Sequence, residues 1–158
     1  MTIDDFNNSI KRHKAFKDYA QAFNLCLKCI KDVELRQYAI ETGEKLIKEH
    51  AYEVLETSGS KRILTIPLDL NIEWIVDSAI SLGYKELKRG SISTGIFSSC
   101  PCIIVGSLLA KQKFGIVKNK DNTMSLLYSF GSFTSDYKLI KFLCSNIIEQ
   151  LKNKYNGL

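Results

Sequence analysis

Hydrophobic residues over 14–31 recur at the spacing of one helix face. At about 100° per residue, seven apolar side chains fall in one arc, and most polar residues fall opposite. The arc consists of Phe16, Tyr19, Ala20, Phe23, Cys26, Leu27 and Ile30. The apolar residues of the first ten positions lie outside this arc, so we expect a break near 11–14. Thr2 and Asp5 have the spacing of a capping box, which predicts that a first helix begins there.

A second amphipathic helix is predicted over 33–57. Its apolar positions cover more than half of the helical wheel, which is wider than the stripe of a helix packed on one side only. Gly43 and His50 lie near the middle of this apolar face. A glycine there lets a neighbouring element approach closely. We therefore expect the helix over 14–31 and the helix over 33–57 to pair antiparallel. The helix over 33–57 is expected to contact the rest of the chain as well.

The hydrophobic period changes after Ser58-Gly59-Ser60, which we interpret as a turn between two parts of one fold. Residues 62–66 are rich in β-branched side chains and predict a short strand. A helix is then expected to begin at Asp69 or Asn71, either of which can cap it. It ends at Leu82-Gly83, because a glycine is a typical C-terminal stop.

The remaining elements follow from short apolar runs and turn residues. A strand is predicted to start at 84–87, and the small polar residues of 88–99 predict a loop or an irregular edge. Strands are also predicted at 102–109, 114–117 and 123–130, the last two joined by a turn at 119–122, and an amphipathic helix is predicted at 136–155.

This element order predicts an α+β fold, in which an N-terminal helical hairpin packs on a small, mainly antiparallel sheet with two further helices. We interpret residues 1–158 as a single domain, made of a helical hairpin (1–57) and an α+β part (61–158). The wide apolar face of the second helix is the reason for expecting one shared core.

Composition agrees with a single globular domain. The chain has 158 residues, of which 45% are hydrophobic and 25% are charged. Its first ten residues include Asp4 and Asp5 and lack the basic start and apolar run of a signal peptide. The apolar run 102–110 is too short to span a bilayer. We therefore expect a cytoplasmic protein with no membrane partner.

The five cysteines are an odd number, which does not suit a closed disulfide framework. Cys26 and Cys29 form a C-x-x-C pair, and Cys100 and Cys102 form a C-x-C pair. Two thiol pairs are a ligand set that zinc accepts. The first pair, however, lies within a predicted helix, where thiols commonly act as small hydrophobes. We predict no metal and no cofactor.

Cys100 and Cys102 border a polar loop and are the candidate reactive thiols. A nucleophilic cysteine needs a base within reach, and the only histidines, His13 and His50, belong to the helical part. The sequence contains no phosphate-loop, dinucleotide-binding or serine-nucleophile motif. We therefore favour a protein that is not an enzyme.

Basic residues gather around the predicted hairpin, and the net charge is +5. The candidate contacts for an anion or nucleic acid are Lys85, Lys88, Arg89, Lys111, Lys113, Lys118 and Lys120. Aromatic residues are interleaved with them, and lysines beside aromatics on a sheet often bind single-stranded nucleic acid. Lysines also protect sheet edges against aggregation, and those aromatics can equally face the core. The loop 89–95 offers amides, hydroxyls and a guanidinium to an anion.

Two hypotheses for function remain. The first is a non-enzymatic protein-interaction or adaptor domain that binds a protein partner or associates with itself as a homodimer. The second is a binder of nucleic acid or another anionic ligand through the lysine-rich hairpin. The wide apolar face of the second helix favours the first, and the grouping of lysines favours the second.

Overall fold

The computed structural model describes residues 1–49, 61–107 and 109–156. His50 and the Ser58-Gly59-Ser60 turn, both singled out in the sequence, lie outside the described residues. Contacts divide the chain into two compact units, which we call the helical unit (1–58 and 144–158) and the sheet unit (59–143). Each is described by itself, and the shared core expected from the sequence stays a prediction.

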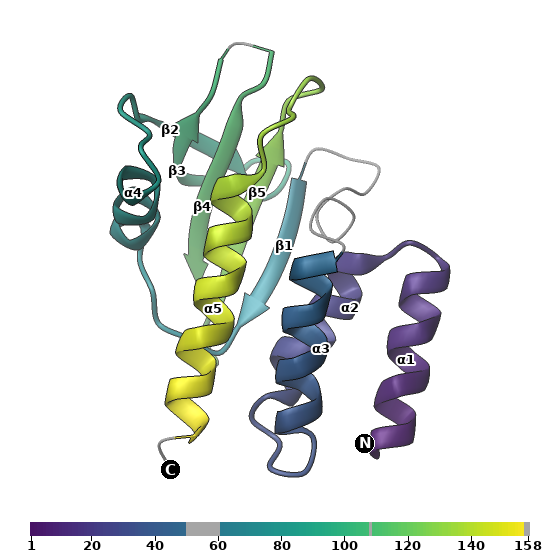
Figure 1. Ribbon diagram of the computed structural model, residues 1–158. Helices are drawn as coiled ribbons and strands as arrows, with labels where there is room; N and C mark the ends of the chain where they lie inside the picture. Colours follow the sequence, from purple (N-terminus) through teal and green to yellow (C-terminus); the bar gives the residue numbers. More distant parts are fainter. Residues whose placement is uncertain (50–60, 108, 157–158) are drawn as a thin grey trace. The chain divides into compact units, whose positions relative to one another are not determined.

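The helical unit contains α1 (Ile3–Ala15), α2 (Tyr19–Cys29), α3 (Arg36–Glu49) and most of α5 (Lys138–Asn156), as Figure 1 shows. The predicted capping box is confirmed, because the Thr2 hydroxyl accepts from the Asp5 amide and the Asp5 carboxylate accepts from the Thr2 amide. α3 begins three residues later than predicted, and the last residues of the predicted 33–57 helix lie outside the described part.

The break between the first two helices lies at 16–18, not at 11–14. Lys17 has a left-handed backbone (φ 55°), and the Asp18 carboxylate accepts from the Gln21 amide as the cap of α2. This break changes the helical phase before Tyr19. Phe16, predicted to face inward, is therefore 80% exposed.

Gly43 brings α3 close to its neighbours, as predicted. A Cβ at this glycine would lie 2.8 Å from the Cδ1 of Ile148 on α5, and Phe23 and Cys26 on α2 are the next nearest. Arg36 fixes the start of α3, since its guanidinium donates to the carbonyls of Ile30 and Tyr155 at 2.9 and 2.8 Å. Three helices of the unit thus meet at one small residue, and α1 adds the buried Phe6 and Ile10 to the core.

The sheet unit contains five antiparallel strands and α4 (Ile72–Ser81). Its strands are β1 (Lys61–Ile66), β2 (Lys88–Ser93), β3 (Ser99–Val105), β4 (Gln112–Lys118) and β5 (Met124–Phe130). They lie in the order β1-β5-β4-β3-β2. The predicted α+β class, with an antiparallel sheet and two further helices, is confirmed.

Two local predictions in the sheet unit were wrong and two are confirmed. Residues 84–87 form no strand, and residues 88–93 of the segment predicted as a loop or an irregular edge form a regular strand, β2, at the edge of the sheet. Asn71 caps α4, and Gly83 follows its end with φ 93°. The turn between β4 and β5 also lies where expected.

Within the sheet unit, one face of the sheet carries α4 and the first turns of α5 (Figure 1). α4 is tied to it by the ion pair of Glu73 with Arg89 on β2. The first turns of α5 are tied to it by Tyr137, whose ring packs edge-on against Phe130. Leu64, Ile66, Phe114, Leu126 and Tyr128 alternate onto this face and are fully buried.

The opposite face has a smaller apolar cluster of its own. Ile92, Cys102 and Leu127 are buried there, with Cys100, Ile104 and Val117 packed against them. The cluster depends on Gly115, because the Cγ2 of Ile92 lies 3.0 Å from where a Cβ on that glycine would be. β2 and β4 are separated by β3, so this close approach requires the sheet to curl towards this face.

Candidate functional site

The seven basic residues singled out in the sequence do not form one surface. β4 is seven residues long and therefore extends for roughly 20 Å. Lys111 and Lys113 lie at its start, whereas Lys118 and Lys120 lie at its far end, beside the turn to β5. A single ligand small enough for one site therefore does not reach all of them.

The strand register divides these residues further. Arg89 alternates onto the helix-covered face, where its guanidinium contacts the Glu73 carboxylate at 3.0 Å. Lys118 pairs with Asp69 at 2.8 Å. Lys88 and Lys113 alternate onto the opposite face, on either side of Ile104. Lys85 precedes β2 in the irregular segment and is exposed.

The aromatic residues near these lysines are mostly inside. Phe114 and Tyr128 are completely buried on the helix-covered face, and Phe130 packs against both of them and against Tyr137. Phe133, the aromatic residue that follows β5 in the sequence, is in contrast largely exposed. The buried rings cannot stack on bases without unfolding the core.

Each thiol is buried or exposed according to the side of its helix or strand on which it lies. Cys26 and Cys29 are buried on α2, and burial raises the pKa of both thiols. Cys102 is buried with Ile92 and Leu127 in the smaller apolar cluster, which we call the second apolar cluster. Burial raises the pKa of Cys102 as well, although the nearby Lys113 opposes the shift. Cys100 is partly exposed. Among the described residues, no group of three or more His, Cys, Asp or Glu side chains could hold a metal ion.

The most exposed apolar side chains lie on the tip between β2 and β3, within the segment that the sequence predicts to be a loop or an irregular edge of small polar residues. Ile96 is 92% exposed and Phe97 is 101% exposed. The tip is closed by a backbone bond from the Thr94 amide to the Ser98 carbonyl at 3.0 Å and by a bond between the two side-chain hydroxyls at 2.8 Å. We call residues 93–99 the apolar tip. Its signal in the sequence is a pair of large hydrophobic residues within a run of serine, threonine and glycine.

A second exposed apolar pair, Leu109 and Phe133, lies where the β3–β4 loop meets the segment after β5. The Phe133 amide donates to the Leu109 carbonyl at 3.2 Å, and the Gly131 amide donates to the Lys111 carbonyl at 2.8 Å. β3 runs from the apolar tip towards this loop. The two apolar features therefore lie at opposite ends of the sheet.

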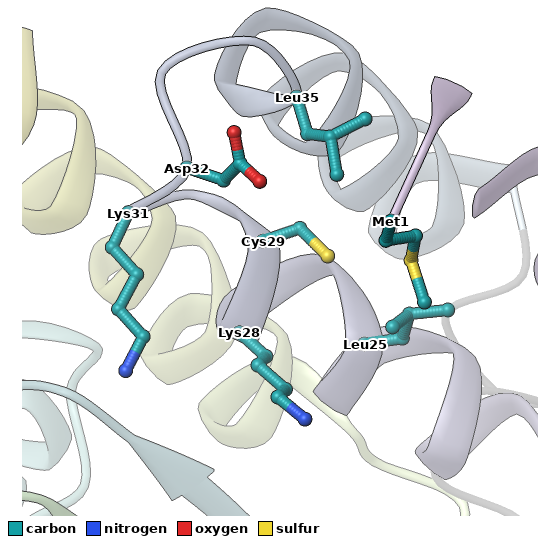
Figure 2. A pocket seen from close by; sticks show the side chains of 7 residues that line it. All are labelled: Met1, Leu25, Lys28, Cys29, Lys31, Asp32 and Leu35. Carbon is teal, nitrogen blue, oxygen red and sulfur yellow. The ribbon is translucent and has the colours of Figure 1, made fainter. Parts of the chain in front are cut away.

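The helical unit contains a pocket of about 350 Å³ beside the turn from α2 to α3 (Figure 2). Figure 2 shows Leu25, Lys28 and Cys29 rising from α2, and Asp32 and Leu35 closing the pocket from the turn. Its remaining lining residues are Met1 and Lys31. Figure 2 shows the Asp32 carboxylate beside Cys29 and Leu35, whereas the Lys28 and Lys31 side chains point away from these two residues.

Comparison with known proteins finds no family model, no curated protein and no solved structure that matches the chain. Among the described residues, no helix is long and apolar enough to cross a bilayer. The function must therefore be argued from the surfaces and the pocket themselves.

Proposed function

We propose that this protein is a non-enzymatic protein-interaction domain that docks through its apolar tip. The observation that carries this proposal is the nearly complete exposure of Ile96 and Phe97 on a hydrogen-bonded hairpin tip. Single exposed hydrophobic residues are ordinary, but an adjacent pair held out by a closed loop is typical of an interaction site. Aromatic side chains are also frequent anchors at protein interfaces.

The surroundings of the tip support a protein partner with an uncharged apolar pocket. Residues 93–99 contain no charged side chain, so the tip can enter such a pocket without burying an unpaired charge. β2 is an edge strand, and an edge beside an anchor can add a strand from the partner. The partner in this proposal is another protein or a second copy of the chain.

Photo-crosslinking from the tip tests this proposal. A photoreactive phenylalanine analogue placed at Phe97 is expected to give covalent adducts with a partner protein or with a second copy. The same analogue at Ile80, which is exposed on α4, is the matched control. Substituting Ile96→Ser and Phe97→Ser should abolish capture of the same partner, while Ile80→Ser should retain it. Equal crosslinking from both positions, together with a monomer in light scattering, would contradict the proposal.

Binding of an anionic ligand is the second candidate, favoured by one observation. Lys88 and Lys113 share the face opposite the helices and lie on neighbouring strands, with Ile104 between them in register. Fluorescence anisotropy with labelled single-stranded RNA at two salt concentrations tests it, because phosphate contacts make affinity fall steeply with salt. Substituting both lysines by glutamate should abolish binding, whereas Lys45→Glu on α3 should not. No binding at low salt would exclude this candidate.

A further inference from the structure

The geometry points to a second site in the helical unit: we infer that the pocket between α2 and the α2–α3 turn binds a small carboxylic acid with an apolar body, of the class of medium-chain fatty acids. This site shares no residue with the apolar tip. The proposed pocket site can therefore be tested independently of the proposed docking function.

The inner wall of the pocket suits an apolar body. Leu35 is almost completely buried, and Leu25 and Met1 complete a surface of aliphatic and thioether groups (Figure 2). Cys29 contributes a sulfur that behaves as a small hydrophobe. Burial, reinforced by the Asp32 carboxylate nearby, raises the pKa of this thiol above its ordinary value.

The size of the pocket limits the ligand. A volume of about 350 Å³ lies at the small end of the range for ligand pockets, which runs from about 300 to 1,000 Å³. A single short chain or a single ring fits such a space, whereas a two-chain lipid exceeds it. The lining also offers few polar groups that could form hydrogen bonds with the many donors and acceptors of a sugar or a base.

The excess of lysine over carboxylate in the lining favours an anionic head group. Lys28 and Lys31 both line the pocket, and neither forms an ion pair with any residue that the structure describes. The single carboxylate of the lining, Asp32, already accepts a hydrogen bond from the Glu34 amide at 3.0 Å within the turn. The lining therefore has a net positive charge, and its lysines can reach a carboxylate at the surface while the apolar body is buried.

Isothermal titration of the full chain with decanoate tests the site, with decylamine as the probe of opposite charge. Decanoate is expected to bind at one site, and decylamine is not. The double substitution Lys28→Glu and Lys31→Glu should lower the affinity for decanoate by about tenfold. The effect is modest because exposed charge pairs are individually weak. Lys45→Glu, an exposed lysine on α3, should leave the affinity unchanged. Equal binding of both probes, or no binding of decanoate, would overturn the inference.

Protection of Cys29 locates the bound ligand within the chain. Decanoate should slow the alkylation of Cys29 severalfold while leaving Cys100 of the sheet unit unaffected. Leu25→Phe, which narrows the pocket, should weaken binding without loss of fold, as checked by circular dichroism. Binding that neither protects Cys29 nor responds to this substitution would place the acid elsewhere and refute the site.

Discussion

The Cδ1 of Ile148 on α5 lies 2.8 Å from the position that a Cβ on Gly43 of α3 would occupy. Carbon atoms do not approach that closely, so a side chain at residue 43 would force the end of the Ile148 side chain to move. The closest atom is the end of a buried but flexible isoleucine, whereas the next neighbour, the Cβ of Cys26, lies at an ordinary 3.6 Å. One methyl group therefore makes the tightest contact at this glycine.

This relationship predicts that the effect of Gly43→Ala reverses sign with the residue at 148. In the natural background, overpacking should outweigh the gain in helix propensity and lower the free energy of unfolding by about 1 kcal/mol. Ile148→Val removes the interfering Cδ1, so Gly43→Ala in that background should raise the free energy of unfolding by up to about 1 kcal/mol. Urea denaturation of the four proteins measures this cycle. Stabilisation by alanine in both backgrounds would contradict it.

The hydrophobic pattern predicts the elements whose local signals agree with their packing. Asn71 and Gly83 bound α4 as expected, and the β4–β5 hairpin follows from its turn residues. β2 was missed because, of its six residues, only Ile92 is buried, so alternation is absent. Its strand conformation depends on pairing with β3, which a local pattern does not contain.

The candidate site was less predictable because exposure and charge pairing are tertiary properties. The sequence places Arg89 and Lys118 among free basic residues, but Glu73 and Asp69 neutralise them in the fold. A large apolar pair is normally assigned to the core, and nothing in the spacing of Ile96 and Phe97 indicates that both lie in solvent. The exposure of this pair follows from the conformation of the loop, which the sequence pattern does not contain.

Tyr84 and Asp136 form a second testable pair. The Tyr84 hydroxyl donates to the Asp136 carboxylate at 2.7 Å. Burial alone would raise the pKa of Asp136, but hydrogen bonds from the Lys138 amide and the Tyr84 hydroxyl, with the Lys138 charge, lower it below its usual value. Tyr84→Phe should therefore raise the pKa of Asp136, as measured by NMR titration of its side-chain carboxyl. Tyr38→Phe, at an exposed tyrosine of α3, is the control and should leave it unchanged.

The same pair gives a pH dependence of stability with a defined sign. A carboxylate whose pKa is lower in the folded state contributes stability above its unfolded pKa of about 3.9, and this contribution is lost as the pH falls through the folded value. Asp136→Asn should thus lower the free energy of unfolding at neutral pH, by less than about 1 kcal/mol because the pair is exposed. The difference from the natural protein should vanish in strong acid. A difference that stays constant across this range would contradict the assignment.

The thiols should differ in their rates of alkylation. At neutral pH we expect Cys100, the most accessible thiol, to react first. Cys26, Cys102 and Cys144 should react at least about tenfold more slowly, since they are buried and burial raises the pKa of each, that of Cys144 to about 12. Time-resolved mass spectrometry with iodoacetamide measures the order. In denaturant the rates should converge, and fast native labelling of Cys102 would show that the second apolar cluster opens.

Gly115 should be the least replaceable residue of that cluster. A Cβ there would lie 3.0 Å from the Cγ2 of Ile92, 3.0 Å from the Pro101 carbonyl oxygen and 3.1 Å from the Cys100 sulfur. Because one of these neighbours is backbone, Gly115→Ala should lower the free energy of unfolding by about 1–3 kcal/mol. Gly95→Ala is the control, since its one near neighbour is the end of the exposed Ser98 side chain and not backbone, and it should change stability by less than about 0.5 kcal/mol.

Coupling between positions 92 and 115 tests whether the curl of the sheet causes this sensitivity. Ile92→Ala removes the Cγ2 that lies over Gly115, so the cost of Gly115→Ala should be smaller in that background than in the natural one. It should not vanish, because the Pro101 carbonyl remains in place. Strictly additive effects, measured by thermal denaturation of the four proteins, would show that β2 does not lie over β4 in solution. The buried state of Ile92, Cys102 and Leu127 would then need another cause, because the strand order alone leaves β2 too far from Gly115 for contact.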